Sequence, residues 1–208
     1  MSRTISSTGI ERLALYSRYL SSANVAEQTF VSSEELAKAV EQTAAQVRRD
    51  LSCFGTFGTP GRGYARAELE EKLSEILGKV KSQRVVLVGI GNLGSALLAY
   101  KGFQSHPYTI VAAFDKDEAR IGERLEGLEI QDIRKLSEVI VRTGAKIGVV
   151  SVPARSAQEV VDTLIASGIQ GILNFAPVRV TVPKGIVLQD VDFSIKLDRL
   201  CYELEHIT

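Results

Sequence analysis

Residues 84–94 read RVVLVGIGNLG, and this stretch decides the fold of the chain. Its apolar part, residues 85–88, consists of residues that favour β-structure and predicts a buried strand. Three glycines follow in the spacing G-x-G-x-x-G, and residues 95–99 then predict a helix. A strand, a glycine turn and a helix in this order are the context in which the glycine pattern indicates a dinucleotide site.

The glycines of this loop have separate expected roles. Gly89 permits the tight turn, Gly91 lets the backbone approach a pyrophosphate, and Gly94 lets the helix pack closely on the strand. Asn92 and Leu93 complete the loop, and the N-terminus of the following helix offers free N–H groups to phosphates. The loop is therefore a candidate binding site for the cofactor phosphates.

A carboxylate follows at the distance that this site needs. A second predicted strand, 109–114, ends in Asp115, 21 residues after Gly94, where an acid accepts hydrogen bonds from the adenosine ribose. Because an acid there repels a 2′-phosphate, the sequence favours NADH and NAD+ as ligands. A Rossmann-like unit that binds another nucleotide, such as coenzyme A, or no nucleotide, is the alternative interpretation.

The rest of the second half alternates apolar strands with helices, which predicts an α/β fold with a Rossmann-type parallel sheet. Further strands are expected at 128–130, 147–150, 171–173 and 187–190, with a helix over 133–141. Val152 and Pro153 lie between the fourth strand and the next helix, where proline suits the first helical turn. Ligands bind at this carboxyl edge of such sheets, so both residues are candidates for the cofactor site.

The composition of the 208 residues, 45% hydrophobic and 24% charged, is that of a soluble protein with real cores. Apolar runs stay short of the ~18 residues of a membrane span, and residues 1–12 lack the apolar part of a signal peptide. We therefore expect a cytoplasmic protein without a membrane partner. Cys53 and Cys201 are far apart and indicate neither a disulfide framework nor a metal site.

The first eighty residues predict a helix-turn-helix. Apolar spacing predicts a helix over 9–22. Ser32 and Glu35 form a capping box before a second helix, and Thr43 and Gln46 repeat this pattern before a third. On a helical wheel, the exposed face of this third helix carries small residues, an amide and two guanidiniums, which suit the DNA major groove. A solvated helix face is the alternative.

Residues 54–64, FGTFGTPGRGY, predict a β-hairpin with Arg62 at its tip, the wing of a winged helix. Residues 1–80 balance ten basic with ten acidic residues, yet 42–66 carry four arginines against one acid, a local charge of +3. Wing arginines contact phosphates or the minor groove. The DNA-facing candidates are Thr43, Gln46, Arg48, Arg49, Ser52, Arg62 and Tyr64.

The tail, residues 193–207, predicts a helix that is apolar on more than one side. Such a helix either covers its own sheet or reaches a second subunit, and we favour the subunit because palindromic DNA requires a two-fold dimer. No catalytic constellation is visible. The only histidines, His106 and His206, lie in a predicted loop and at the C-terminus, which counts against an enzyme.

Over nearly its whole length the chain resembles the Rex family of bacterial redox-sensing transcriptional repressors. The resemblance is carried by TAAQVRRDLS at 43–52, the following FGTFG and GRGY, GIGNLGSALLAY, AAFDKD, SVPARSAQEV, GILNFAPV and DVDF. NFAP together with GRGY is the specific combination. Cys53 stands where the family often has an aromatic residue, and 24–30 is a variable turn.

The resemblance implies a homodimer with a winged-helix domain at 1–80, a Rossmann domain at 81–191 and a C-terminal helix at 192–208 that is exchanged with the partner subunit. It implies that the dimer represses genes of fermentation and respiration from palindromic operators. NAD+ would be compatible with DNA binding, and NADH would release the repressor. An NAD-dependent oxidoreductase, a coenzyme A-binding module and a thiol sensor that uses Cys53 or Cys201 stay open as alternatives.

The resemblance also assigns four residues to sensing. Tyr100 matches a tyrosine that senses the nicotinamide, and Arg18 and Asp192 match residues linked to it between subunits. Phe193 matches a ring that the partner's helix inserts beside the nicotinamide. The alternatives are a solvated Arg18, a helix-capping Asp192, and a Tyr100 and a Phe193 that only pack.

Overall fold

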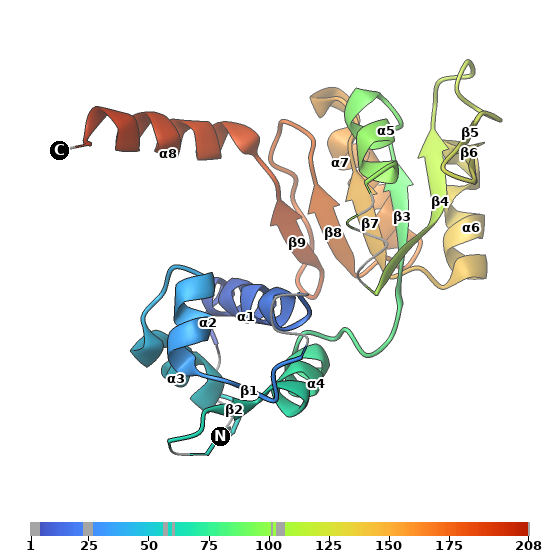
Figure 1. Ribbon diagram of the computed structural model, residues 1–208. Coiled ribbons are helices and arrows are strands. Elements are labelled where there is room, and N and C mark those ends of the chain that lie inside the picture. Colours follow the sequence, from blue (N-terminus) through green and yellow to red (C-terminus); the bar gives the residue numbers. More distant parts are fainter. Residues whose placement is uncertain are drawn as a thin grey trace. The chain divides into compact units, whose positions relative to one another are not determined.

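The computed structural model describes residues 5–22, 27–55, 58–59, 61–100, 102 and 107–207. The chain forms two compact units, Met1–Lys81 and Ser82–Thr208, which Figure 1 shows and which are described in turn. The C-terminal helix belongs to the second unit.

The first unit is a winged-helix arrangement. Its described helices are α1 (Ser7–Leu20), α2 (Ser33–Ala39), α3 (Ala44–Ser52) and α4 (Arg66–Ile76). A small antiparallel sheet pairs β1 (Phe30–Val31) with β2 (Tyr64–Ala65). The core is apolar and draws on every helix, with Leu13 and Leu20 from α1, Leu36 from α2, Leu51 from α3 and Leu73 from α4.

Both predicted helix starts are confirmed, but only the first has the complete capping box. Ser32 and Glu35 form the complete capping box at α2. At α3, the Thr43 hydroxyl accepts the Gln46 N–H at 3.2 Å, as expected. The Gln46 side chain does not complete the box, because its amide donates to Asp50 on the next turn instead.

The predicted wing is present with a different strand partner. An antiparallel bridge between Thr59 and Gly63 closes the turn that holds Arg62. The strand that follows, β2, pairs with β1, more than thirty residues earlier in the chain, rather than with the start of 54–64. Residues 56, 57 and 60 of the wing, and 24–26 of the variable turn, lie outside the described residues.

The second unit is built on a seven-stranded sheet in the order β5-β6-β4-β3-β7-β8-β9. Its strands are β3 (Gln83–Val88), β4 (Tyr108–Asp115), β5 (Arg124–Leu125), β6 (Leu128–Asp132), β7 (Ile147–Val150), β8 (Gly171–Asn174) and β9 (Val187–Asp190). Only the short edge strand β5 is antiparallel. The strand order reverses between β3 and β7, which is where such sheets bind ligands.

Helices cover both faces of this sheet because the side chains of β3 alternate. Val86 and Val88 pack with α6 (Leu136–Thr143) and α7 (Ala154–Ala166). Val85 and Leu87 pack on the other face with α5 (Asn92–Leu98). The helix predicted from residue 133 begins as a 3-10 turn, Ile133–Lys135.

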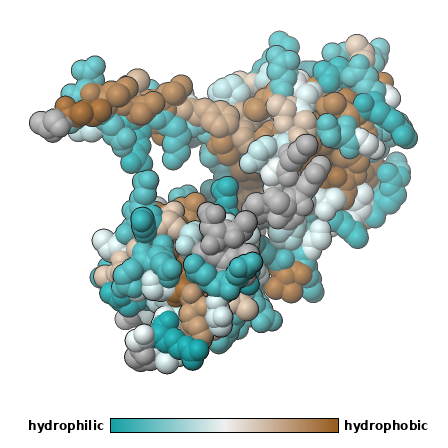
Figure 2. Space-filling model, in the orientation of Figure 1, coloured by the Kyte–Doolittle hydropathy of each residue, from teal (hydrophilic) through white to brown (hydrophobic). Residues whose placement is uncertain are grey.

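The chain ends in α8 (Phe193–Glu205), which buries none of its thirteen residues. Its apolar side chains remain exposed, Leu197 to 60% and Leu204 to 60%. Figure 2 shows an apolar band running along α8 above a hydrophilic side. Among the described helices, none has the length and apolar character needed to cross a membrane.

Candidate cofactor and DNA sites

The glycine loop has the geometry that the sequence predicts. Gly89 has a φ of +93°, and a Cβ there would lie 2.7 Å from the Ser151 carbonyl oxygen. A Cβ on Gly94 would lie 1.9 Å from the Gly89 carbonyl oxygen, so only glycine lets α5 approach β3 this closely. At Gly91 a Cβ would meet nothing within 4 Å. The backbone at Gly91 is therefore open to a ligand.

Asp115 binds the glycine loop directly. Its carboxylate accepts the Ile90 N–H at 2.6 Å and the N–H groups of Lys116 and Asp117 at 2.7 and 3.0 Å. These bonds connect the end of β4 to the turn after β3. The sequence predicts this carboxylate as a ribose acceptor, but its role in shaping the loop is visible only in the structure.

A cavity of about 910 Å³ opens beside this loop. This is within the size range of small-molecule and cofactor sites. Of the predicted cofactor residues, it is lined by Gly89, Gly91, Asn92, Leu93, Asp115, Val152 and Pro153. Gly94 is buried behind the loop, where it serves packing rather than ligand contact. Pro153 is the N-cap residue of α7, directly before the first turn in which the sequence placed it.

Arg120 and Ser151 also line the cavity, although neither is among the residues predicted from the sequence. An Arg120 Nη donates to the Ser95 hydroxyl in the first turns of α5 at 3.2 Å. Its Nε lies 2.9 Å from a Glu123 carboxylate oxygen. Ser151 donates to the Gly89 carbonyl at 2.8 Å. The signal available for Ser151 was its position directly after a buried strand at the ligand-binding edge.

The sensing residues implied by the family resemblance do not line the cavity. Tyr100 is 57% exposed and follows α5 at the end away from the glycine loop. Phe193 is 61% exposed, so it is not a core residue. Its ring lies 6.3 Å from that of Phe175, which lines the cavity. Asp192 caps α8 by accepting the Ser194 N–H at 2.9 Å.

The NFAP loop has a structural explanation. Asn174 is 1% exposed and ends β8. Its amide nitrogen donates to the Val178 carbonyl and to the Asp190 carboxylate at 2.9 and 2.8 Å. Its side-chain oxygen accepts the Ala176 N–H at 3.0 Å, so every arm of this buried amide is bonded. The side chain thereby fastens the loop after β8 to the end of β9.

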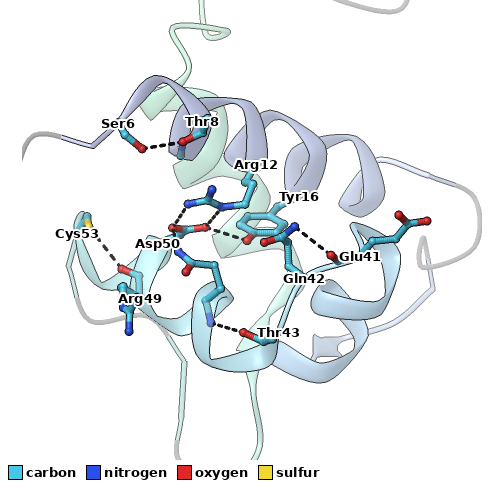
Figure 3. Close-up of polar contacts among 12 residues, drawn as sticks. Ser6, Thr8, Arg12, Tyr16, Glu41, Gln42, Thr43, Arg49, Asp50 and Cys53 are labelled. Carbon is cyan, nitrogen blue, oxygen red and sulfur yellow. Dashed lines mark hydrogen bonds and ion pairs between the residues drawn. The ribbon is translucent and has the colours of Figure 1, made fainter. Parts of the chain in front are cut away.

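On the first unit, the helix face predicted to meet DNA is exposed at Arg48, Arg49 and Ser52. Figure 3 shows the Arg49 side chain pointing away from α1. The Ser52 hydroxyl donates to the Arg49 carbonyl at 2.8 Å. Gln46 is half-buried, and its side-chain amide donates a hydrogen bond to Asp50. This bond restricts its side chain, which a fully solvated glutamine would leave free to rotate.

The count of +3 over residues 42–66 overstates the unpaired positive charge. Two of its four arginines form ion pairs with glutamates outside that range. Arg48 lies 3.3 Å from a Glu34 carboxylate oxygen, and Arg66 lies 2.8 Å from one of Glu70. Within the described part of the chain, Arg49 makes no ion pair. The expected basic patch is therefore smaller than the sequence count predicts.

The wing contributes one exposed arginine and one buried tyrosine. The Arg62 guanidinium stacks over the Phe30 ring at 3.9 Å, a cation–π contact that holds it against β1. Tyr64 was predicted to face DNA, but its ring is only 7% exposed and packs in the core of the first unit. Because a side chain so buried anchors β2, we correct that assignment.

Arg18 is exposed in the last turn of α1, near Lys79, whose pKa is lowered by burial and by the Arg18 charge.

Both cysteines are free. His106 lies outside the described residues, and the His206 ring stacks on Tyr202. The described residues contain no cluster of acidic, histidine or cysteine side chains that could hold a metal ion.

Two sequence-family models match the chain, one in each unit. Residues 4–52 match a family described as "Putative DNA-binding protein N-terminus". Residues 80–178 match one described as "CoA binding domain".

Similar proteins cover almost the whole chain. A "Redox-sensing transcriptional repressor Rex" from Pelotomaculum thermopropionicum is 45% identical over 94% of this chain and 92% of its own. A crystal structure of RSP in complex with beta-NAD+ and operator DNA matches with a TM-score of 0.90 and 34% identity, over 97% of this chain and 93% of that one. RSP in complex with beta-NADH matches with a TM-score of 0.85 and 32% identity, over 96% and 94%. These names are those of regulators rather than enzymes.

Proposed function

The chain belongs to the Rex family of redox-sensing transcriptional repressors, and from this premise we propose how it acts. A homodimer binds a palindromic operator through its two N-terminal units, with NAD+ compatible with binding. NADH in the Rossmann unit releases it. The observation that carries this proposal is the open backbone at Gly91 beside Asp115, in a chain whose other unit is a winged helix.

The cofactor fits the residues that line the cavity. The N–H groups of the loop at Gly91, Asn92 and Leu93 would bind the pyrophosphate, aided by the N-terminus of α5. Asp115 keeps one acceptor position, on Oδ2, for a ribose hydroxyl, since it accepts three hydrogen bonds and has room for about four. Val152 and Pro153 would contact the cofactor from the neighbouring strand end.

The DNA-binding surface is the outer face of α3 together with the wing. Arg49 and Arg62 would bind phosphates or base edges, and Arg48 would do so after leaving Glu34. Thr43 and Ser52 would contact the backbone at the two ends of the helix. Gln46 would read a base from the first turn, the part of a recognition helix that contacts base edges.

Coupling between the two sites requires the dimer. NADH and NAD+ differ by one charge and by the planarity of the nicotinamide, so only groups beside that ring distinguish them. The partner's α8 would place Phe193 there, and Tyr100, Arg18 and Asp192 would form the link between subunits. All four are exposed within one chain, which leaves them accessible for this role. A coupling of about 1–3 kcal/mol would weaken operator binding by roughly 5–150-fold.

A gel shift tests this function. Duplexes that the wild-type protein selects from a random DNA pool serve as the operator, and the bound fraction is measured against NADH and, separately, NAD+. We expect NADH to release the protein and NAD+ to leave it bound. Asp115→Ala should keep operator binding and lose the response to NADH. Operator occupancy that saturating NADH leaves unchanged would contradict the proposal.

Coenzyme A is a second candidate ligand because the matching family model for residues 80–178 describes a CoA binding domain. The Asp115 carboxylate beside the loop argues against it, since it would repel the added phosphate of coenzyme A. Calorimetry with NADH and coenzyme A separates the two. Tighter binding of coenzyme A would replace NADH as the ligand.

A further inference from the structure

Asp50 is a buried carboxylate on α3, the proposed DNA-binding helix, and it accepts four hydrogen bonds from side chains. The residue is 4% exposed. Arg12 of α1 donates a hydrogen bond to each carboxylate oxygen, from Nε at 2.6 Å and from an Nη at 2.7 Å. The Tyr16 hydroxyl donates at 3.0 Å and the Gln46 amide at 2.7 Å. Figure 3 shows Arg12 and Tyr16 converging on Asp50 from α1.

These four bonds use the full accepting capacity of the carboxylate. One oxygen receives Arg12 and Gln46, and the other receives Arg12 and Tyr16. Burial alone would raise the pKa of Asp50, but the hydrogen bonds from Arg12, Gln46 and Tyr16 outweigh it and lower that pKa. The group therefore stays charged and can only accept hydrogen bonds.

A carboxylate that only accepts fixes which end of the Gln46 amide faces it. The nitrogen must turn toward Asp50, because the amide oxygen would be repelled. This leaves the amide oxygen and one N–H of Gln46 for another partner. Gln46 lies in the first turn of α3, three residues after its Thr43 cap, where recognition helices contact base edges.

We propose that Asp50 is a specificity-determining positioning residue: with Arg12 as counter-ion, it holds the Gln46 amide in the single orientation that reads adenine in the operator. In that orientation the amide oxygen accepts from adenine N6 and the remaining N–H donates to N7. Arg12 also cancels the negative charge that Asp50 would otherwise present near the DNA phosphates. The inference rests on the proposed function, because it needs α3 to read the operator.

The test compares two affinities of one protein, for the selected operator and for a scrambled duplex of the same composition. Asp50→Asn lets the amide at position 46 turn over, so we expect operator affinity to fall about tenfold. Affinity for the scrambled duplex should stay or rise, because non-specific binding is electrostatic and the variant is less negative. A purely structural role for Asp50 would lower both affinities together.

Tyr16→Phe is the matched control, because it removes one bond to the same carboxylate and leaves the Gln46 bond in place. It should leave the ratio of the two affinities unchanged. In a Gln46→Ala background, Asp50→Asn should change the ratio no further, since Asp50 acts through Gln46. If Asp50→Asn does not fold, Asp50→Glu keeps the charge, shifts the carboxylate by one methylene and should lower the ratio too.

Three outcomes decide between the claims. An unchanged ratio in a folded Asp50 variant overturns the inference, and so does an equal loss of ratio in Tyr16→Phe. A wild-type protein that shows no preference for any selected duplex overturns the proposed function itself, which is a separate failure.

Discussion

Helices α1 and α8 have almost the same length, fourteen and thirteen residues, and opposite surroundings. In α1, Leu13, Tyr16 and Leu20 are completely buried. In α8 every residue is exposed to solvent in its own chain. Both helices carry an apolar stripe, so the difference lies in what covers it.

The contrast shows that an amphipathic pattern specifies an apolar face but not its partner. The other helices of the first unit cover α1, and that unit completes its own core. Among the described residues, the Phe175 ring approaches α8 at its base, while every residue of α8 stays exposed. An exposed apolar face of this length is typical of a protein–protein interface, and our proposal assigns it to a second copy of the chain.

Charge added to the apolar stripe of α8 should have the largest effect. Leu197→Glu with Leu200→Glu should abolish the proposed dimer, because two carboxylates cannot be buried unpaired in an apolar contact. Operator affinity should then fall about a hundredfold or more, since one half-site remains for each monomer. Sedimentation and the gel shift measure the two effects, with Lys196→Glu, off the stripe, as the control. A double variant that is still dimeric would contradict the role of α8.

The second test removes the same side chain from each helix. Leu13→Ala should lower the free energy of unfolding of the first unit by about 2–5 kcal/mol, because Leu13 is 0% exposed. Leu197→Ala should leave thermal unfolding of the dilute monomer nearly unchanged, since that side chain is already in water. Circular dichroism on heating measures both. Similar losses would show that α8 is covered within its own chain.

Two aspartates with lowered pKa values, buried Asp50 and exposed Asp192, should respond differently to acid. The Asp50 pKa lies below its value in the unfolded chain, so its contribution to stability is present above about pH 4 and is lost as the pH falls further. Asp192 is fully exposed, and hydrogen bonds within its own cap lower its pKa. Helical signal should therefore fall below about pH 4, and Asp192→Asn should leave that midpoint unchanged.

The smallest expected effect concerns the base of α8. Phe193→Ala removes the ring that the proposed dimer places beside the nicotinamide, which should weaken NADH binding about two- to tenfold. Calorimetry on the dimer measures it, and Tyr202→Ala farther along α8 serves as the control. Equal affinities in wild type and Phe193→Ala would remove Phe193 from the cofactor site.

Local signals were sufficient to predict most of the fold. Residues 85–88 and 187–190 proved to be strands, and the caps at Ser32 and Thr43 proved to start helices. Each of these depends on neighbours within a few positions. The same holds for the glycine loop, in which Gly94 lies so close to Gly89 that a Cβ on Gly94 would collide with the Gly89 carbonyl oxygen.

The missed features join residues that are far apart in the chain. Arg12 and Asp50 are separated by 38 positions, and a surface arginine looks the same in a sequence as a buried one. The pairing of β1 with β2 and the neutralisation of Arg48 by Glu34 have the same origin. Tyr64 was misassigned because a ring beside a basic turn fits either a core or a DNA contact.

The hydrogen bonds made by Asn174 affect how two copies of the chain would associate. It fastens Asp190, and the Asn174 carbonyl accepts the Val191 N–H at 2.8 Å, one residue before the cap of α8. The segment that connects β9 to α8 is therefore held in place by hydrogen bonds to β8. Because the segment before α8 is already ordered in one chain, little of its internal freedom is lost when a partner binds α8, which lowers this part of the entropic cost of pairing.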